Sequence, residues 1–180
     1  MSQFPLGSAF FGRQHYALMI SKPQVIPMLV EASPSFQTAV DEHRAFYEEE
    51  IFYPLLGDFA RHLLELYQTG RSAEFPAIAQ VIERLHTEGD DFVREGATIG
   101  LLEGVQNAWG HADVDPEFFA SYLLPVSRRW WDELHAFWRG ERRYVGEGLQ
   151  REITAEDIQQ IRDERRAFNE KLKREREGVA

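Results

Sequence analysis

Residues 54–70 read PLLGDFARHLLELYQTG, a stretch that opens with a proline and closes with a glycine. Proline is favoured in the first turn of a helix and glycine just past its end, so these two residues mark out one helix. Its apolar residues recur at intervals of three and four: Leu55, Phe59, Leu63, Leu66 and Tyr67. This spacing places them on one side, and the stretch therefore predicts an amphipathic helix with one buried face.

Similar start and stop signals divide the rest of the chain into helices. The predicted segments are 21–31, 33–49, 54–70, 72–89, 90–110, 115–124, 127–140 and 154–180. No segment shows sustained alternation of apolar and polar residues, and only the connector around Tyr144 and Val145 leaves room for a short strand. Because short connections favour antiparallel neighbours, we expect an all-α fold, an irregular bundle of about seven or eight antiparallel helices with a long C-terminal helix.

The chain length of 180 residues and 20.9 kDa fits one domain with additions at its ends. Residues 1–18 have no helical period and are predicted to be an N-terminal extension. Residues 19–142 are predicted to form the helical domain, and residues 143–180 a connector and the C-terminal helix. That last helix carries only a thin apolar stripe, so it either packs loosely on the domain or forms a homodimer contact.

The charge and the residue types restrict the function classes. Twenty basic residues against thirty acidic ones give a net charge of −10, which repels phosphate backbones and argues against a nucleic-acid partner. The chain has no cysteine, so a disulfide framework and a cysteine nucleophile are excluded. No run of about twenty apolar residues is present. We therefore expect no membrane partner and a cytoplasmic location.

Catalytic and metal-binding patterns find little support. Two acid-x-x-His turns occur, Glu83 to His86 and Asp132 to His135, where the six histidines and thirty acids of this chain predict one by chance. Finding two is unremarkable, and helical geometry places Glu83 and Asp132 away from the apolar faces. His43 lies on an apolar stripe, where it is either a buried general base or a hydrogen-bonded core residue. Nucleophile elbows, phosphate loops and dinucleotide fingerprints are absent. We therefore predict no metal, no cofactor and no catalytic residue, and expect that the protein is not an enzyme.

Three glycines break the local rules for a helix. Gly96, Gly100 and Gly104 recur every four residues inside the segment 90–110, and each costs a helix about 1 kcal/mol relative to alanine. They form a strip that Asn107 continues and Glu103 flanks. Either a neighbouring helix packs closely on this strip, or the strip floors a groove in which a partner or ligand contacts Glu103 and Asn107.

Acidic residues are concentrated in the first five predicted helices. Residues 19–60 hold seven acids and two bases, and residues 61–110 hold eight and four. The densest cluster is Asp41, Glu42, Glu48, Glu49 and Glu50. It is either a solvated helix face or an acidic docking surface that speeds the encounter with a basic partner.

Four tryptophans add a weaker indication of binding. Trp130 and Trp138 share the apolar face of the segment 127–140 and are expected to point inward. Trp109 and Trp131 lie near helix borders and are candidate interface anchors, since tryptophan is enriched at binding hot spots.

Several short stretches carry a family resemblance. They are KPQVIP at 22–27, SPSF at 33–36, LLGDFA at 55–60, ATIGLLEG at 97–104 and SRRWWDEL at 127–134. Over roughly residues 20–140 the chain resembles an uncharacterised family of small bacterial helical proteins associated with polymorphic toxin systems as immunity proteins. The resemblance implies a cytoplasmic protein that binds a cognate toxin domain as a heterodimer and blocks its active site. It supplies no catalytic motif, and it implies that residues 1–18 and 145–180 are additions.

Two functional hypotheses follow. The first is an immunity-type protein that binds and neutralises a cognate bacterial toxin domain by occlusion. Its candidate partner-binding residues are Asp41, Glu42, Glu48, Glu49, Glu50, Gly96, Gly100, Glu103, Gly104 and Asn107. The alternative is a small-ligand-binding or enzymatic helical protein with a pocket beside the Gly96, Gly100 and Gly104 helix, using His43 or His62 together with Glu103.

Overall fold

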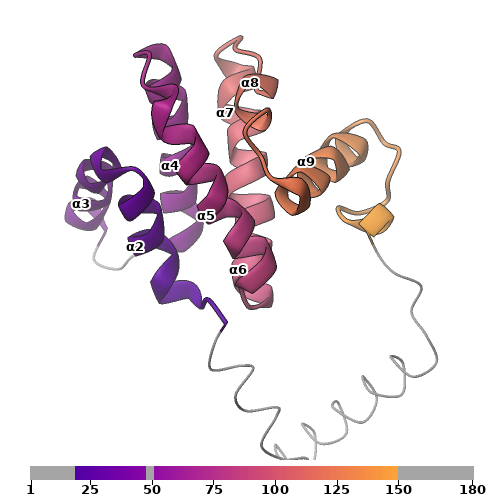
Figure 1. Cartoon of the computed structure of the whole chain (residues 1–180), viewed down its shortest axis with the longest axis horizontal. Helices are drawn as coiled ribbons and strands as arrows, with labels where there is room; N and C mark the ends of the chain where they lie inside the picture. The colour runs from indigo at the N-terminus through magenta and orange to yellow at the C-terminus, as the bar shows by residue number, and fades with distance from the viewer. Residues whose placement is uncertain (1–18, 48–50, 150–180) are drawn as a thin grey trace, which may run out of the picture. The chain divides into compact units, whose positions relative to one another are not determined.

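The computed structural model describes residues 19–47 and 51–149, and in these ranges the chain is helical (Figure 1). The helices are α2 (Lys22–Ala32), α3 (Gln37–Phe46), α4 (Phe52–Gln68), α5 (Phe75–Glu88), α6 (Asp91–Glu95), α7 (Glu103–His111), α8 (Glu117–Ala120) and α9 (Pro125–Trp138). The π-helical segment η3 (Gly96–Leu102) joins α6 to α7, and three short 3-10 turns are η1 (Pro34–Phe36), η2 (Ser72–Glu74) and η4 (Glu147–Leu149). Among these residues there is no strand, only a parallel bridge between Ile20 and Gly89. The predicted all-α bundle is confirmed.

The helices up to Val145 form one compact unit, and a second unit begins at Gly146. Of the second unit the structure describes only the turn η4. The predicted N-terminal extension 1–18 and C-terminal helix 154–180 both lie outside the described residues.

The helix ends follow local capping chemistry. Gln24 reaches back to the start of α2, where its Oε1 accepts from the Ser21 backbone N at 2.9 Å. The Asp90 side chain accepts from the Val93 backbone N at 2.8 Å and so caps α6. Past the end of α4, Gly70 has a φ of +73°, a left-handed conformation that glycine adopts without strain. These local interactions explain why the starts and stops were visible in the sequence.

The core is centred on α4, whose predicted apolar face is buried. Its fully buried side chains are Leu55, Leu56, Phe59, Leu63 and Leu66. The predicted face of α5 is buried as well, through Ile78, Ile82 and Leu85. Burial of each such side chain contributes about 1.5–3 kcal/mol, so the apolar spacing in the sequence determines which side of each helix meets the others.

The glycine strip is a helix-packing surface. The segments α6, η3 and α7 follow one another in space (Figure 1), and α4 lies against η3 and α7. A Cβ added at Gly96 would lie 2.7 Å from Phe52 Cε1, and one added at Gly104 would lie 3.2 Å from Ala60 Cβ. At Gly100 it would lie 3.1 Å from the Cβ of Leu56. Gly96 and Gly100 are buried under α4 and are not open to a partner, so the groove interpretation does not hold at these two positions.

Three of the four tryptophans are placed differently from the prediction. Trp109 and Trp131 are fully buried, whereas Trp138 ends α9 and is 57% exposed. Trp130 is partly buried against the core, as predicted. Trp109 packs against Tyr67 of α4 with ring centroids 5.0 Å apart, and Trp131 Nε1 donates to Glu117 Oε1 of α8 at 2.7 Å. The apolar spacing within one helix does not reveal these partners on other helices.

Glu83 is also not where the helical wheel placed it. Its carboxylate accepts from the backbone N of Val126 at 2.9 Å and of Ser127 at 2.8 Å, and from Ser127 Oγ at 2.5 Å. These two backbone groups open α9, so Glu83 of α5 caps a helix distant in sequence. Burial raises the pKa of Glu83, but the hydrogen bonds from Ser127 and Val126 outweigh it and hold the pKa below its ordinary value.

Candidate functional site

A cleft runs along the outer side of α4, between α3 and α7. It consists of two adjoining hollows of about 430 and 440 Å³ that share Gly57 and Arg61. The first hollow is also lined by Ala39, Glu42, His43, Tyr47, Pro54 and Asp58. The second is also lined by Leu64, Gly104, Asn107, Ala108 and His111. We call this combined feature the α4 cleft.

Gly57 lies at the centre of the α4 cleft. It belongs to the interior of α4, where glycine costs about 1 kcal/mol relative to alanine. A Cβ added there would meet only the Arg61 Nη1 atom, at 3.8 Å. Unlike the three glycines of the packing strip, Gly57 therefore has no close neighbour that requires the absence of a side chain.

A histidine and a carboxylate line the first hollow together. His43 is 5% exposed, and its Nδ1 lies 3.1 Å from Asp58 Oδ2. Because an ionised carboxylate only accepts hydrogen bonds, Nδ1 is the donor in this contact, and in the neutral imidazole Nε2 is then an acceptor. Nε2 is buried and has no hydrogen-bond partner among residues 19–47 and 51–149. Asp58 also pairs with Arg61, and the His43 ring packs on Tyr47 at 4.6 Å between centroids.

The predicted site residues are only partly brought together. Glu42 lines the first hollow, and Gly104 and Asn107 line the second. Asp41 is exposed beside the cleft and accepts from Gln37 Nε2 at 2.7 Å. Glu103 does not line either hollow; it is half-buried, and burial raises its pKa. Glu48, Glu49 and Glu50 lie outside the described residues.

The sequence interpretation missed Gly57, Asp58 and Arg61. A usable signal was present, since Gly57 interrupts the apolar pattern in the middle of the stretch 54–70. An interior helix glycine needs an explanation, and this holds for Gly57 as much as for Gly96, Gly100 and Gly104. For those three glycines the explanation is close packing on α4.

A serine, a histidine and a glutamate also meet elsewhere, but in an unsuitable order. Ser33 Oγ donates to Glu74 Oε2 at 2.6 Å and lies 3.0 Å from His62 Nε2. In a nucleophilic triad the carboxylate orients the histidine, whereas here it binds the serine hydroxyl. Burial lowers the pKa of His62. We interpret this buried cluster as a structural tie between η1, α4 and η2.

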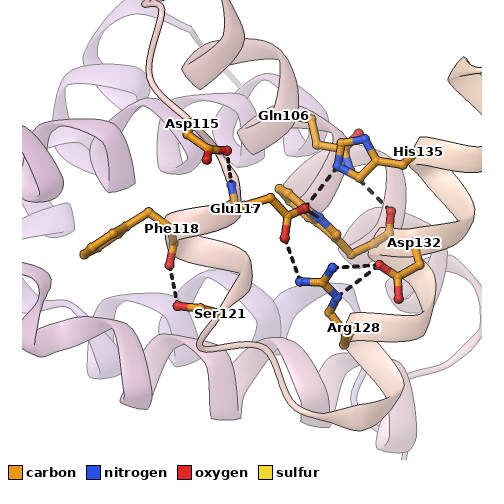
Figure 2. A network of polar contacts seen from close by, with 9 residues as sticks. Gln106, Asp115, Glu117, Phe118, Ser121, Arg128, Asp132 and His135 are labelled. Carbon is orange, nitrogen blue, oxygen red and sulfur yellow. Dashed lines mark hydrogen bonds and ion pairs between the residues drawn. The ribbon is translucent and has the colours of Figure 1, made fainter.

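Figure 2 shows a second polar cluster, which joins α8 to α9. Glu117 accepts from Trp131 Nε1 at 2.7 Å and from Arg128 Nη1 at 2.9 Å, and it lies 3.5 Å from His135 Nε2. Burial raises the pKa of Glu117, but the hydrogen bonds from Trp131 and Arg128 outweigh it and lower the pKa. These groups bind one another, so the cluster fastens the two helices together.

The two acid-x-x-His turns have structural roles as well. Within residues 19–47 and 51–149, no group of three or more metal-binding side chains comes together. His86 is engaged by the Ile82 carbonyl oxygen and the Thr98 hydroxyl, and Glu83 caps α9. In the same ranges, none of the helices combines the length and apolarity needed to cross a membrane.

These observations define a small all-helical domain with an open cleft along one helix. The chain belongs to the DUF7674 family, a domain of unknown function, whose profile matches residues 26–139. The match runs from α2 to the end of α9 and so includes every helix that lines the α4 cleft. Searches of curated proteins and of solved structures found no significant match. The family description names no link to polymorphic toxin systems or immunity proteins.

Proposed function

We propose that this chain is an immunity-type protein that binds a cognate bacterial toxin domain and neutralises it by occlusion. The α4 cleft and the adjoining end of α3 are the proposed contact surface. The observation that carries the proposal is the open cleft over Gly57, which adjoins exposed aromatic side chains and acidic residues. The resemblance described above supplies the class of partner.

The exposed aromatic residues support a protein partner. Phe46 is 80% exposed, and Tyr47 is 38% exposed and also lines the first hollow. Their ring centroids lie 4.8 Å apart, and Ile51 adds a third exposed apolar side chain, at 43%. Aromatic residues commonly anchor protein interfaces, and adjacent exposed apolar side chains mark interaction sites.

The charge of the same region favours a basic partner. Asp41 and Glu42 are exposed on α3, and the whole chain carries a net charge of −10. An acidic surface accelerates the encounter with a basic protein, and this acceleration weakens as salt screens it. Neutralisation by occlusion needs no further chemistry from this chain.

The proposal is tested by affinity capture of the tagged full chain from its native host. A toxin-like domain that co-purifies at a near one-to-one ratio supports it. The double variant Asp41→Lys, Glu42→Lys should then slow association about tenfold and reduce its salt dependence. The double variant Glu31→Lys, Asp91→Lys makes the same change in net charge at exposed acids of α2 and α6 outside the cleft, and it is the control. Absence of a toxin-like partner argues against the immunity function. Unchanged association kinetics of the Asp41→Lys, Glu42→Lys variant show that α3 is not part of the interface.

A second candidate function is supported by the first hollow alone. His43 and Asp58 form a histidine–carboxylate pair of the kind that serves as a general base, and His43 Nε2 has no partner in the described part of the chain. This favours a small-ligand-binding or enzymatic protein, with the second hollow beside Gly104 extending the pocket. Native mass spectrometry of the purified chain tests it: a bound small molecule that is lost in His43→Gln supports this function. A chain that is ligand-free, even from its native host, argues against it.

A further inference from the structure

At Gly57 none of the described residues packs closely enough to require a glycine inside α4. An interior helix glycine is costly, and close packing explains that cost for Gly96 and Gly100. At Gly57 the nearest atom to an added Cβ is the end of the Arg61 side chain, which is 66% exposed. The backbone of α4 is therefore accessible at the point where the two hollows meet, and a side chain at this position would project between them.

The first hollow offers acceptors to a cation. Glu42 is exposed and has no hydrogen bond or ion pair among the described residues. The charge of Asp58 is already balanced by Arg61. The Tyr47 ring adds an aromatic surface, which attracts guanidinium and ammonium groups. An exposed carboxylate and an aromatic ring in one hollow together favour a cationic group.

The second hollow has a different character. Its lining includes Leu64, Ala108 and the backbone of Gly104, which suit an apolar side chain. Because the two hollows share Gly57 and Arg61, one occupant can reach both. A peptide segment presents a cationic and an apolar side chain at such adjoining positions.

We propose that the α4 cleft binds a peptide segment of the partner protein, with an arginine side chain in the first hollow and an apolar side chain in the second. This rests on the proposed function, since it takes the partner to be a protein, and it names the partner's contact chemistry. Glu42 receives the guanidinium beside the Tyr47 ring, and Gly57 allows the segment's backbone to approach α4.

The test is an NMR titration of the ¹⁵N-labelled full chain with short capped peptides. Three probes carry arginine and leucine separated by zero, one or two alanines, and each has a counterpart with neutral citrulline in place of arginine. At least one arginine probe should shift the amide signals of Gly57 and Gly104, with a Kd of about 1 mM, and its citrulline counterpart should bind at least about tenfold more weakly.

Variants locate the binding. Gly57→Phe should abolish the shifts at Gly104 by filling the cleft, and Gly57→Ala should weaken binding several-fold, because its Cβ would stand where the segment's backbone approaches α4. Gly110→Phe is the matched control, because Gly110 is also open and does not line either hollow. Glu42→Gln should weaken the arginine probe several-fold and leave its citrulline counterpart unchanged, and this variant still tests the proposal if Gly57→Phe does not fold.

Three results would overturn the inference: equal binding of arginine and citrulline probes, undiminished binding to Gly57→Phe, or no shift with any probe at about 10 mM, well above the expected Kd. Its failure is distinguishable from failure of the proposed function. If a captured toxin domain binds Gly57→Phe as tightly as the unaltered chain, the immunity function is supported and the cleft is excluded as its binding site. If peptides bind in an arginine-dependent way but no toxin is captured, binding in the cleft is supported and the immunity function is contradicted.

Discussion

His86 should make the free energy of unfolding fall as the solution becomes acidic. The residue is 5% exposed, with Nδ1 3.0 Å from the Ile82 carbonyl oxygen and Nε2 3.2 Å from Thr98 Oγ1. Trp130 stacks on it with ring centroids 6.1 Å apart. Burial lowers the pKa of His86 from 6.5 to about 4, because the charged imidazolium loses its hydration inside the core.

The sign of the effect follows from proton linkage. The folded-state pKa lies below the unfolded-state value, so the unfolded chain binds the proton first as the pH falls. The contribution of neutral His86 to the free energy of unfolding is fully present above pH 6.5, and it is lost progressively as the pH falls to about 4. At about 1.36 kcal/mol per pH unit the full loss is roughly 3 kcal/mol, and about 2 kcal/mol of it falls between about pH 7.5 and pH 5.

The assay is urea denaturation, followed by tryptophan fluorescence, of the unaltered chain and of His86→Gln at about pH 7.5 and pH 5. Other groups titrate too, including His62, whose pKa burial also lowers, so the quantity compared is the loss of stability on acidification. His86→Gln should lose about 2 kcal/mol less than the unaltered chain. The control is His111→Gln, at an exposed histidine, which should lose as much as the unaltered chain.

The reasoning is refuted if His86→Gln and the unaltered chain lose the same stability to within about 0.5 kcal/mol. If His111→Gln reduced the loss as much as His86→Gln does, the effect would not depend on burial of the histidine. The absolute stability of His86→Gln does not enter, because only its dependence on pH reports the titration.

Four substitutions test the packing assignments by urea or thermal unfolding at neutral pH. Gly100→Ala should lower the free energy of unfolding by about 1–2 kcal/mol. Its Cβ would lie 3.1 Å from Leu56 Cβ, and this overpacking outweighs the improved helix propensity. Unchanged stability would contradict the packing assignment. Gly57→Ala should raise the free energy of unfolding by about 0.5–1 kcal/mol, and a decrease would show that the position is not open. Glu83→Gln should lower the free energy of unfolding by about 1–3 kcal/mol, because it weakens the cap of α9. Trp131→Phe should lower it by about 1–2 kcal/mol, because it removes the indole N–H donor. A decrease below about 0.5 kcal/mol in either variant would contradict its assigned hydrogen bonds.

Part of the candidate site was predictable from single helices. Glu42, Gly104 and Asn107 were singled out by charge and by glycine spacing, and all three line the α4 cleft. The cleft itself was not predictable, because it arises where α3 and α7 flank α4. The distance between helices that are far apart in sequence does not follow from the spacing within any one of them.

The glycines show the same limit. Spacing showed that Gly96, Gly100 and Gly104 share one strip, and it left open whether a helix or a ligand covers that strip. The neighbouring side chains decided it, since Phe52 and Leu56 fill the space above Gly96 and Gly100. Gly57 has the same cost in isolation, and only the tertiary structure reveals that no side chain from residues 19–47 or 51–149 packs closely above it.

The sequence by itself determined which stretches are helical and the buried faces of α4 and α5. Two predicted helices differ from the structure, because α8 spans only Glu117–Ala120 of the predicted 115–124 and the π-helical η3 interrupts the predicted 90–110. Caps, proline, glycine and apolar spacing act over four residues or fewer, so the pattern and its physical cause lie in the same short stretch. Only the tertiary structure decided that Trp131 is buried and that Glu83 caps α9. Both outcomes depend on partners distant in the chain, because a buried N–H group or a helix end takes whichever acceptor the packing brings to it.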